Sequence, residues 1–155
     1  LSTPIDFEEL ISEIFEDLEY LEEKSHLTTS VKVSGHVPLY SDLTRIGIIL
    51  RNLISNSIKY YNPHNPNPRV DIQVITDNTG ATIRVIDNGI GIPKTSQKDI
   101  FKMFYRGSDK SSGSGLGLYI VKEAVEKLGG KISVKSKIGE GSSFEITLPS
   151  LPHLS

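Results

Sequence analysis

The sequence predicts a two-layer α/β sandwich, in which a mixed, mostly antiparallel sheet of about five strands is covered by three helices. Three stretches, at about residues 6–22, 42–61 and 115–128, carry apolar residues at helical spacing. In the stretches between and after them, apolar and polar residues alternate, which predicts strands. Because the two kinds of stretch follow one another in mixed order, a single sheet with helices on one face accounts for the pattern.

Local signals place the helix ends. Asp6, with Glu9 three positions later, resembles a capping box at the start of the first helix. Asp42 is expected to cap the second helix, and Gly129-Gly130 to end the third. A short helix is expected over about 96–104, with Phe101 and Phe104 anchoring it to the core.

The strands are predicted from alternation and turns. Val31, Val33 and Val37 indicate a strand over about 31–37. A hairpin is expected from alternating residues on both sides of the turn at 77–80. In a last hairpin, across the glycine turn at 139–141, three apolar residues of one strand are expected to face three of the next: Ile132, Val134 and Ile138 opposite Phe144, Ile146 and Leu148.

Composition limits the possible functions. The 155 residues suffice for one domain, expected to span 1–155, and the first residue is not Met, so we expect a piece of a longer polypeptide. Without cysteine, disulfides and thiolate metal sites are excluded, and the four histidines show no metal spacing. No apolar run approaches the ~20 residues of a membrane helix. These features fit a cytoplasmic domain of a parent protein that is either soluble or membrane-anchored.

Charge is unevenly distributed along the chain. Residues 1–23 carry nine acids and no base, whereas residues 24–155 carry 17 basic and 10 acidic residues. A basic body suits an anionic ligand such as a nucleotide. The acids are explained more simply as the solvated face of the first helix.

Four short segments together predict a nucleotide site. Three are rich in glycine, which tolerates positive φ and lets the backbone approach a ligand closely. The fourth lies on the second predicted helix, about 30 residues before the first glycine cluster. The segments are Asn52–Tyr60, Asp87–Pro93, Gly113–Leu118 and Gly139–Phe144.

Asn52, Asn56 and Lys59 share one face of the second helix, because they are four and three residues apart. A hydrated Mg²⁺ and a phosphate would satisfy the two amides, since Mg²⁺ prefers oxygen ligands and keeps several waters. Lys59 would neutralise phosphate charge. The alternative is that both amides cap neighbouring backbone groups.

Asp87 ends a predicted strand, where its carboxylate can accept a hydrogen bond from an exocyclic amine such as that of adenine. Gly89 and Gly91 would let the chain turn beneath the ring. The alternative is an ordinary Asp-Asn-Gly turn.

The segment Gly113–Leu118 leads into a helix, whose free N–H groups can bind an anion. It is not a dinucleotide fingerprint, because Leu118 replaces the last glycine, and no Gly-Lys-Ser/Thr triplet indicates a P-loop. A flexible loop is the alternative. Arg106 could reach a phosphate, or it is a surface residue.

In order and spacing, these segments resemble the catalytic, ATP-binding domain of two-component sensor histidine kinases, a branch of the Bergerat-fold superfamily. The resemblance covers about residues 5–149. Asn52–Tyr60 is similar to the N box, and Asp42-x-x-Arg45 ahead of it is similar too. The later segments, together with Phe101–Phe104, resemble the glycine and phenylalanine boxes.

The resemblance implies a role for each matching residue. Asn56 would ligate Mg²⁺ with Asn52 nearby, and Lys59 and Arg106 would contact phosphates. Asp87 would bind the adenine amine. The other implied nucleotide-binding residues are Tyr60, Gly89, Gly91 and Ile92 around the base and ribose, Ser114, Gly115, Leu116, Gly117 and Leu118 around the phosphates, and Ser143, where the family often has Thr. An ATP lid would span about 94–114.

One position separates the kinases from their relatives. The gyrase, mismatch-repair and chaperone ATPases carry a water-activating Glu one helical turn before the metal Asn, and here that position is Asn52. Hydrolysis would lack its base, whereas transfer to histidine needs less, because an imidazole is already a nucleophile. The implied function is transfer of the ATP γ-phosphate to a histidine, for relay to a response regulator.

The implied partners are a helical dimerisation domain carrying the acceptor histidine, which this chain lacks, and a response-regulator receiver domain. Nucleic acid is not expected as a partner. We expect the parent protein to be a homodimer and this domain to be a monomer. The alternatives are a serine kinase of the same fold, as in anti-sigma factors, a non-catalytic nucleotide-binding module, and a hydrolytic ATPase.

Overall fold

The computed structural model describes residues 1–21, 27–103, 105 and 116–152. Five strands form one sheet in the order β2-β4-β5-β7-β6. They are β2 (Thr28–Ser34), β4 (Arg69–Thr76), β5 (Gly80–Asp87), β6 (Lys131–Lys137) and β7 (Gly141–Pro149). Only β2 and β4 pair in parallel, and the other neighbours are antiparallel. The predicted mixed, mostly antiparallel sheet is therefore confirmed.

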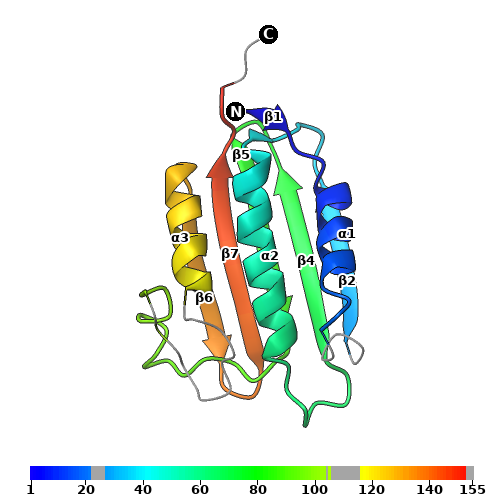
Figure 1. Ribbon diagram of the computed structural model, residues 1–155, viewed down its shortest axis with the longest axis vertical. Helices are drawn as coiled ribbons and strands as arrows, with labels where there is room; N and C mark the ends of the chain where they lie inside the picture. Colours follow the sequence, from blue (N-terminus) through cyan, green and yellow to red (C-terminus); the bar gives the residue numbers. More distant parts are fainter. Residues whose placement is uncertain (22–26, 104, 106–115, 153–155) are drawn as a thin grey trace.

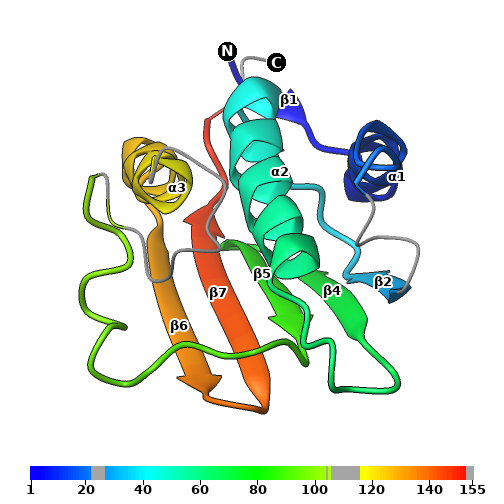
Figure 2. The same cartoon turned by 60° about the horizontal axis from the view of Figure 1, so that its bottom comes forward.

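Three helices cover one face of this sheet (Figures 1 and 2). They are α1 (Phe7–Asp17), α2 (Leu43–Lys59) and α3 (Gly117–Lys127), and α2 lies between the other two. A two-stranded sheet of β1 (Thr3–Pro4) and β3 (Tyr40–Ser41) closes the upper end in Figure 1. This small sheet was not predicted, because its strands are too short to show alternation.

Both predicted N-caps are present. The backbone N–H of Glu9 donates to Asp6 Oδ1 at 3.1 Å, and that of Arg45 donates to Asp42 Oδ1 at 3.2 Å. The Arg45 guanidinium also pairs with Asp42 Oδ2 at 2.9 Å. These carboxylates satisfy donors that the first helical turn leaves free. The first helix ends at Asp17, earlier than the predicted residue 22.

The core lies between the helices and the sheet. The apolar stripe of α2 is fully buried, and it meets alternate residues of the central strands: Ile46, Ile49, Leu50, Leu53 and Ile54 against Ile72, Ile83, Val85 and Ile146. The opposite face of the sheet is polar, and there Arg84 of β5 pairs with Glu145 of β7 at 2.7 Å. This one-sided burial gives the strands their alternating sequence.

Three expectations fail in detail. Within the described part of 96–104 there are consecutive turns, in which Ser96, Asp99 and Lys102 each bond a carbonyl three residues back, so no α-helix forms. Val37 lies beyond β2, because Gly35 turns the chain with φ +107°. Ile138 lies in the β6–β7 turn and is exposed, so it faces no residue of β7.

Candidate nucleotide site

Four segments meet at the lower end of the molecule in Figure 1: the end of α2, the end of β5, the β6–β7 turn and the start of α3. The topology explains this, because β5 and β6 run towards that end while β4 and β7 start from it. Residues from distant parts of the sequence are therefore gathered at one edge.

Asp87 is a partly buried acidic residue at this edge, and its carboxylate is held by several donors. Its Oδ1 accepts the backbone N–H of Gly89 at 2.9 Å and that of Ser142 at 3.3 Å. The hydroxyl of Ser57, which is buried on α2, also donates to it. Burial raises the pKa of Asp87, and these three donors partly offset that rise. The result is an oriented carboxylate in a partly dehydrated position.

The glycines beside Asp87 are required by close approach of backbone segments. A Cβ on Gly89 would lie 2.5 Å from the Tyr60 carbonyl oxygen and 2.9 Å from Asp87 Oδ1. Gly91 and Gly141 have φ of +78° and +111°. A Cβ on Gly91 would overlap the carbonyl of Lys137, and one on Gly141 would overlap that of Asp87. The segment after β5 is thus packed directly against α2 and the β6–β7 turn.

The amide face of α2 lies next to this cluster. Asn52 Nδ2 donates to the Ile48 carbonyl at 2.7 Å, so the capping alternative holds for this amino group. Its Oδ1 points towards α3, since a Cβ on Gly117 would lie 3.3 Å from it. Within the described residues, the side chain of Asn56 makes no hydrogen bond, although it is half-buried. Lys59 is exposed in the last turn of the helix.

The start of α3 offers backbone donors. Among the described residues, no side chain caps this helix, and its first bond along the ladder runs from the Ile120 N–H to the Leu116 carbonyl at 2.8 Å. The preceding N–H groups, of Gly117, Leu118 and Tyr119, have no carbonyl partner within the described residues. Such a helix start can bind an anion.

Several predicted site residues lie outside the described part of the chain, namely Arg106, Ser114 and Gly115, together with Phe104 and about half of the expected lid. Phe101 is described, and its ring contacts Phe144 edge-on, with centroids 6.3 Å apart. Ile92 packs against the core, and the Tyr60 carbonyl accepts the Ile90 N–H at 3.1 Å. Phe101 therefore anchors its segment to the core, as predicted.

The structure does not bring Ser143 to this cluster. Phe144 and Ile146 point towards the helices, and strand alternation places Ser142 with them and Ser143 on the polar face with Glu145. Ser142 is the residue opposite Asp87 in the sheet. The alternation of apolar and polar residues in this strand was therefore a sequence signal that favours Ser142 over Ser143.

Ser57 was also missed by sequence reasoning. It lies in the apolar stripe of α2, between Ile54 and Ile58, and is buried with them. A hydroxyl at such a position needs a polar partner, and this requirement was the available signal.

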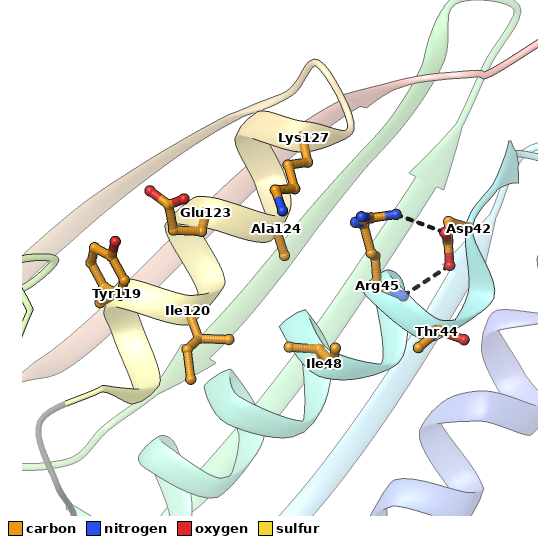
Figure 3. A pocket seen from close by; sticks show the side chains of 9 residues that line it. All are labelled: Asp42, Thr44, Arg45, Ile48, Tyr119, Ile120, Glu123, Ala124 and Lys127. Atoms are coloured by element: carbon orange, nitrogen blue, oxygen red, sulfur yellow. Dashed lines mark hydrogen bonds and ion pairs between the residues drawn. The ribbon is translucent and has the colours of Figure 1, made fainter. Parts of the chain in front are cut away.

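A groove of about 440 Å³ lies elsewhere, between the first half of α2 and the length of α3 (Figure 3). Its lining includes the Asp42–Arg45 pair, Ile48, Ile120 and Lys127. None of the residues gathered around Asp87 lines it. It meets the candidate nucleotide site only at Tyr119, near the start of α3.

Comparison with known proteins agrees with this geometry. The family described as histidine kinase-, DNA gyrase B-, and HSP90-like ATPase matches residues 41–152. The chain belongs to this ATPase family. The matched span includes α2, the end of β5 and α3, which carry the site.

Curated relatives of this ATPase family member include sensor histidine kinases. The chain is 34% identical to the sensor histidine kinase AtsR of Burkholderia thailandensis, over 96% of this chain and 25% of that protein. It is 36% identical to the sensor histidine kinase RppB of Synechocystis, over 91% of this chain and 32% of that protein. The chain thus spans about a quarter to a third of the length of these relatives.

Solved structures show the same fold. The mycobacterial sensor histidine kinase MprB has a TM-score of 0.79 at 29% identity, covering 99% of this chain and all of that one. A nucleotide-free catalytic domain of the histidine kinase ThkA has a TM-score of 0.81 at 26% identity, covering 98% and 99%. In the described part of the chain, no helix is both long and apolar enough to cross a membrane.

Proposed function

We propose that this chain is the catalytic, ATP-binding domain of a sensor histidine kinase. It would bind Mg–ATP and transfer the γ-phosphate to a histidine on a helical dimerisation domain, from which the phosphate passes to a response-regulator aspartate. The observation that carries the proposal is the oriented Asp87 carboxylate, at the same edge as the amide face of α2 and the uncapped start of α3.

Each part of the cluster suits one part of the nucleotide. The carboxylate of Asp87 accepts a hydrogen bond and so suits the 6-amino group of adenine. The segment Gly89–Ile92 would lie along the base, with Tyr60 close by. The N–H groups at the start of α3, which have no carbonyl partner within the described residues, and the Lys59 ammonium would bind phosphates.

The residues present also fit a magnesium ion. Asn56 has a half-buried amide without a partner among the described residues, and its carbonyl oxygen is a ligand that Mg²⁺ accepts. No group of three or more acidic or histidine side chains suited to a metal occurs among the described residues, which agrees with a metal held mainly by phosphate and water. When bound, Mg²⁺ would neutralise charge on the phosphates.

The same helix argues against hydrolysis as the main reaction. From Leu43 to Lys59 it carries no acidic residue, and Asn52 donates its amino group to its own helix. No carboxylate on α2 can therefore activate a water molecule beside Asn56. An imidazole acceptor is already a nucleophile, so transfer to histidine requires only positioning and charge stabilisation.

The test is incubation of this chain with γ-labelled ATP, Mg²⁺ and the helical domain of the parent protein. We expect acid-labile label on the helical domain, as for phosphohistidine, and none when Asn56 is replaced by Ala. Acid-stable label would indicate a serine kinase. Binding without any transfer would indicate a non-catalytic module.

A further inference from the structure

Two polar side chains, Ser136 of β6 and Gln97, fasten the segment after β5 to the sheet. The backbone N–H of Ile92 donates to Ser136 Oγ at 2.7 Å. Gln97 Nε2 donates to the carbonyl oxygens of Ile92 and Ser136, each at 3.0 Å. Ile92 is thus held through both its N–H and its C=O. We call Ser136 and Gln97 the polar clamp.

The clamp also contacts β7, the strand whose Ser142 donates a hydrogen bond to Asp87. Ser136 Oγ lies 2.9 Å from the Gly141 carbonyl oxygen and 2.8 Å from Ser142 Oγ. A serine hydroxyl has one donor and two acceptor positions. Ser136 uses all three if it donates to Gly141 and accepts from Ile92 and Ser142. Ser142 in turn donates its backbone N–H to Asp87 Oδ1.

These bonds form one continuous connection from the Asp87 carboxylate to Ile92. Ser136 and Ser142 are opposite each other in the β6–β7 pairing, so the connection passes from β6 to β7 one pair before the hairpin turn. The positive φ of Gly91, next to Ile92, places the segment directly over the carbonyl of Lys137.

We propose that Ser136 and Gln97 are positioning residues that keep the ring-facing segment Gly91–Ile92 in a fixed place relative to Asp87, so that the purine side of the site is formed before nucleotide binds. This inference rests on the proposed nucleotide site. Neither side chain is required to touch the nucleotide.

The expected effect on ADP affinity depends on how often the segment Gly91–Ile92 occupies its binding-competent place. If the segment occupies the binding-competent place in only a fraction of molecules, the apparent dissociation constant rises by the inverse of that fraction. Loss of the Ser136 hydroxyl leaves the Ile92 N–H and the Gly141 carbonyl without their partner. From the usual cost of such losses, we expect ADP to bind about tenfold more weakly.

The experiment compares Ser136→Ala and Gln97→Ala with the unaltered chain, using Mg–ADP titration calorimetry and hydrogen–deuterium exchange. Ser133→Ala is the matched control, because Ser133 is exposed on the polar side of the same strand. Ser136→Thr keeps a hydroxyl at the position and serves as the rescue variant.

We expect both clamp variants to bind ADP about tenfold more weakly, with faster exchange confined to residues 90–97. Ser136→Thr should restore both properties towards those of the unaltered chain. Unchanged ADP affinity in both clamp variants, or faster exchange throughout the sheet, would overturn the inference. If the unaltered chain did not bind ADP, the proposed function itself would fail, whatever the clamp variants show.

Discussion

The sharpest prediction concerns the replacement of Asp87 by Asn, which keeps the shape of the side chain and removes its charge. Both backbone donors that contact Asp87, the N–H groups of Gly89 and Ser142, point at Oδ1. In the variant they should hold the amide oxygen in that place, because turning the amide would set donor against donor. The amide NH₂ would then take the position of Oδ2 and face the base.

This geometry reverses the preference for the purine. Adenine presents an amino group at its 6-position and would meet a donor, whereas hypoxanthine presents an oxygen and would meet a complementary partner. A hydrogen bond to a charged group contributes about 1.5–3 kcal/mol. Losing it corresponds to an affinity for ADP that is roughly 10- to 150-fold weaker. Inosine diphosphate should bind the variant better than it binds the unaltered chain.

The assay is calorimetric titration of both proteins with Mg–ADP and with Mg–inosine diphosphate. Asp77→Asn is the control, because Asp77 is an acid in the turn that precedes the same strand, at its other end. Burial raises the pKa of Asp87, so a neutral side chain should not destabilise the fold, and the melting temperature checks this. An unchanged ratio of the two dissociation constants in Asp87→Asn would refute the assignment of the base site.

Three further predictions concern acidity, backbone strain and capping. Burial raises the pKa of Asp87, so on acidification ADP affinity should begin to fall at a higher pH than the pKa of an ordinary Asp would give. In Asp87→Asn, ADP affinity should not show this pH-dependent fall. Gly139→Ala should lower the free energy of unfolding by about 1 kcal/mol, because the φ of Gly139 is +81° but no neighbouring atom lies within 4 Å of an added Cβ. Gly141→Ala should lower it by on the order of 3 kcal/mol or more, because the added Cβ would overlap the Asp87 carbonyl. Urea unfolding measures both losses, and equal losses would contradict the structure. Asp42→Ala should lower the free energy of unfolding by about 1 kcal/mol, whereas Asp42→Ser should largely keep the N-cap. The Arg45 N–H lowers the pKa of Asp42, so this stabilisation is present above the pKa of the unfolded chain and is lost as the pH falls through the folded value. Denaturant melts of the unaltered chain and Asp42→Ala should therefore converge at acidic pH, and a constant difference would contradict the capping role.

Much of the site was predictable because its residues are local signals. The spacing of Asn52, Asn56 and Lys59 is a property of one helix, and Asp87 follows a strand that alternates clearly. Whether the nucleotide uses them stays a prediction. Ser142 and Ser143 could not be separated by motif alone, but strand alternation distinguishes them.

The sequence by itself determined the fold class. The spacing of its apolar residues predicts three helices and five strands, each apolar on one face, and these faces can be buried together only if the helices cover one side of a single sheet. It also determined both N-caps, since capping depends on residues three positions apart. Only the tertiary structure decided that residues 96–103 form turns, and that Ser136 and Gln97 hold Ile92 against β6. The contacts of Ser136 with Ile92 and Gln97 join residues 44 and 39 positions apart, and they depend on strand register and side-chain direction, which no local pattern records.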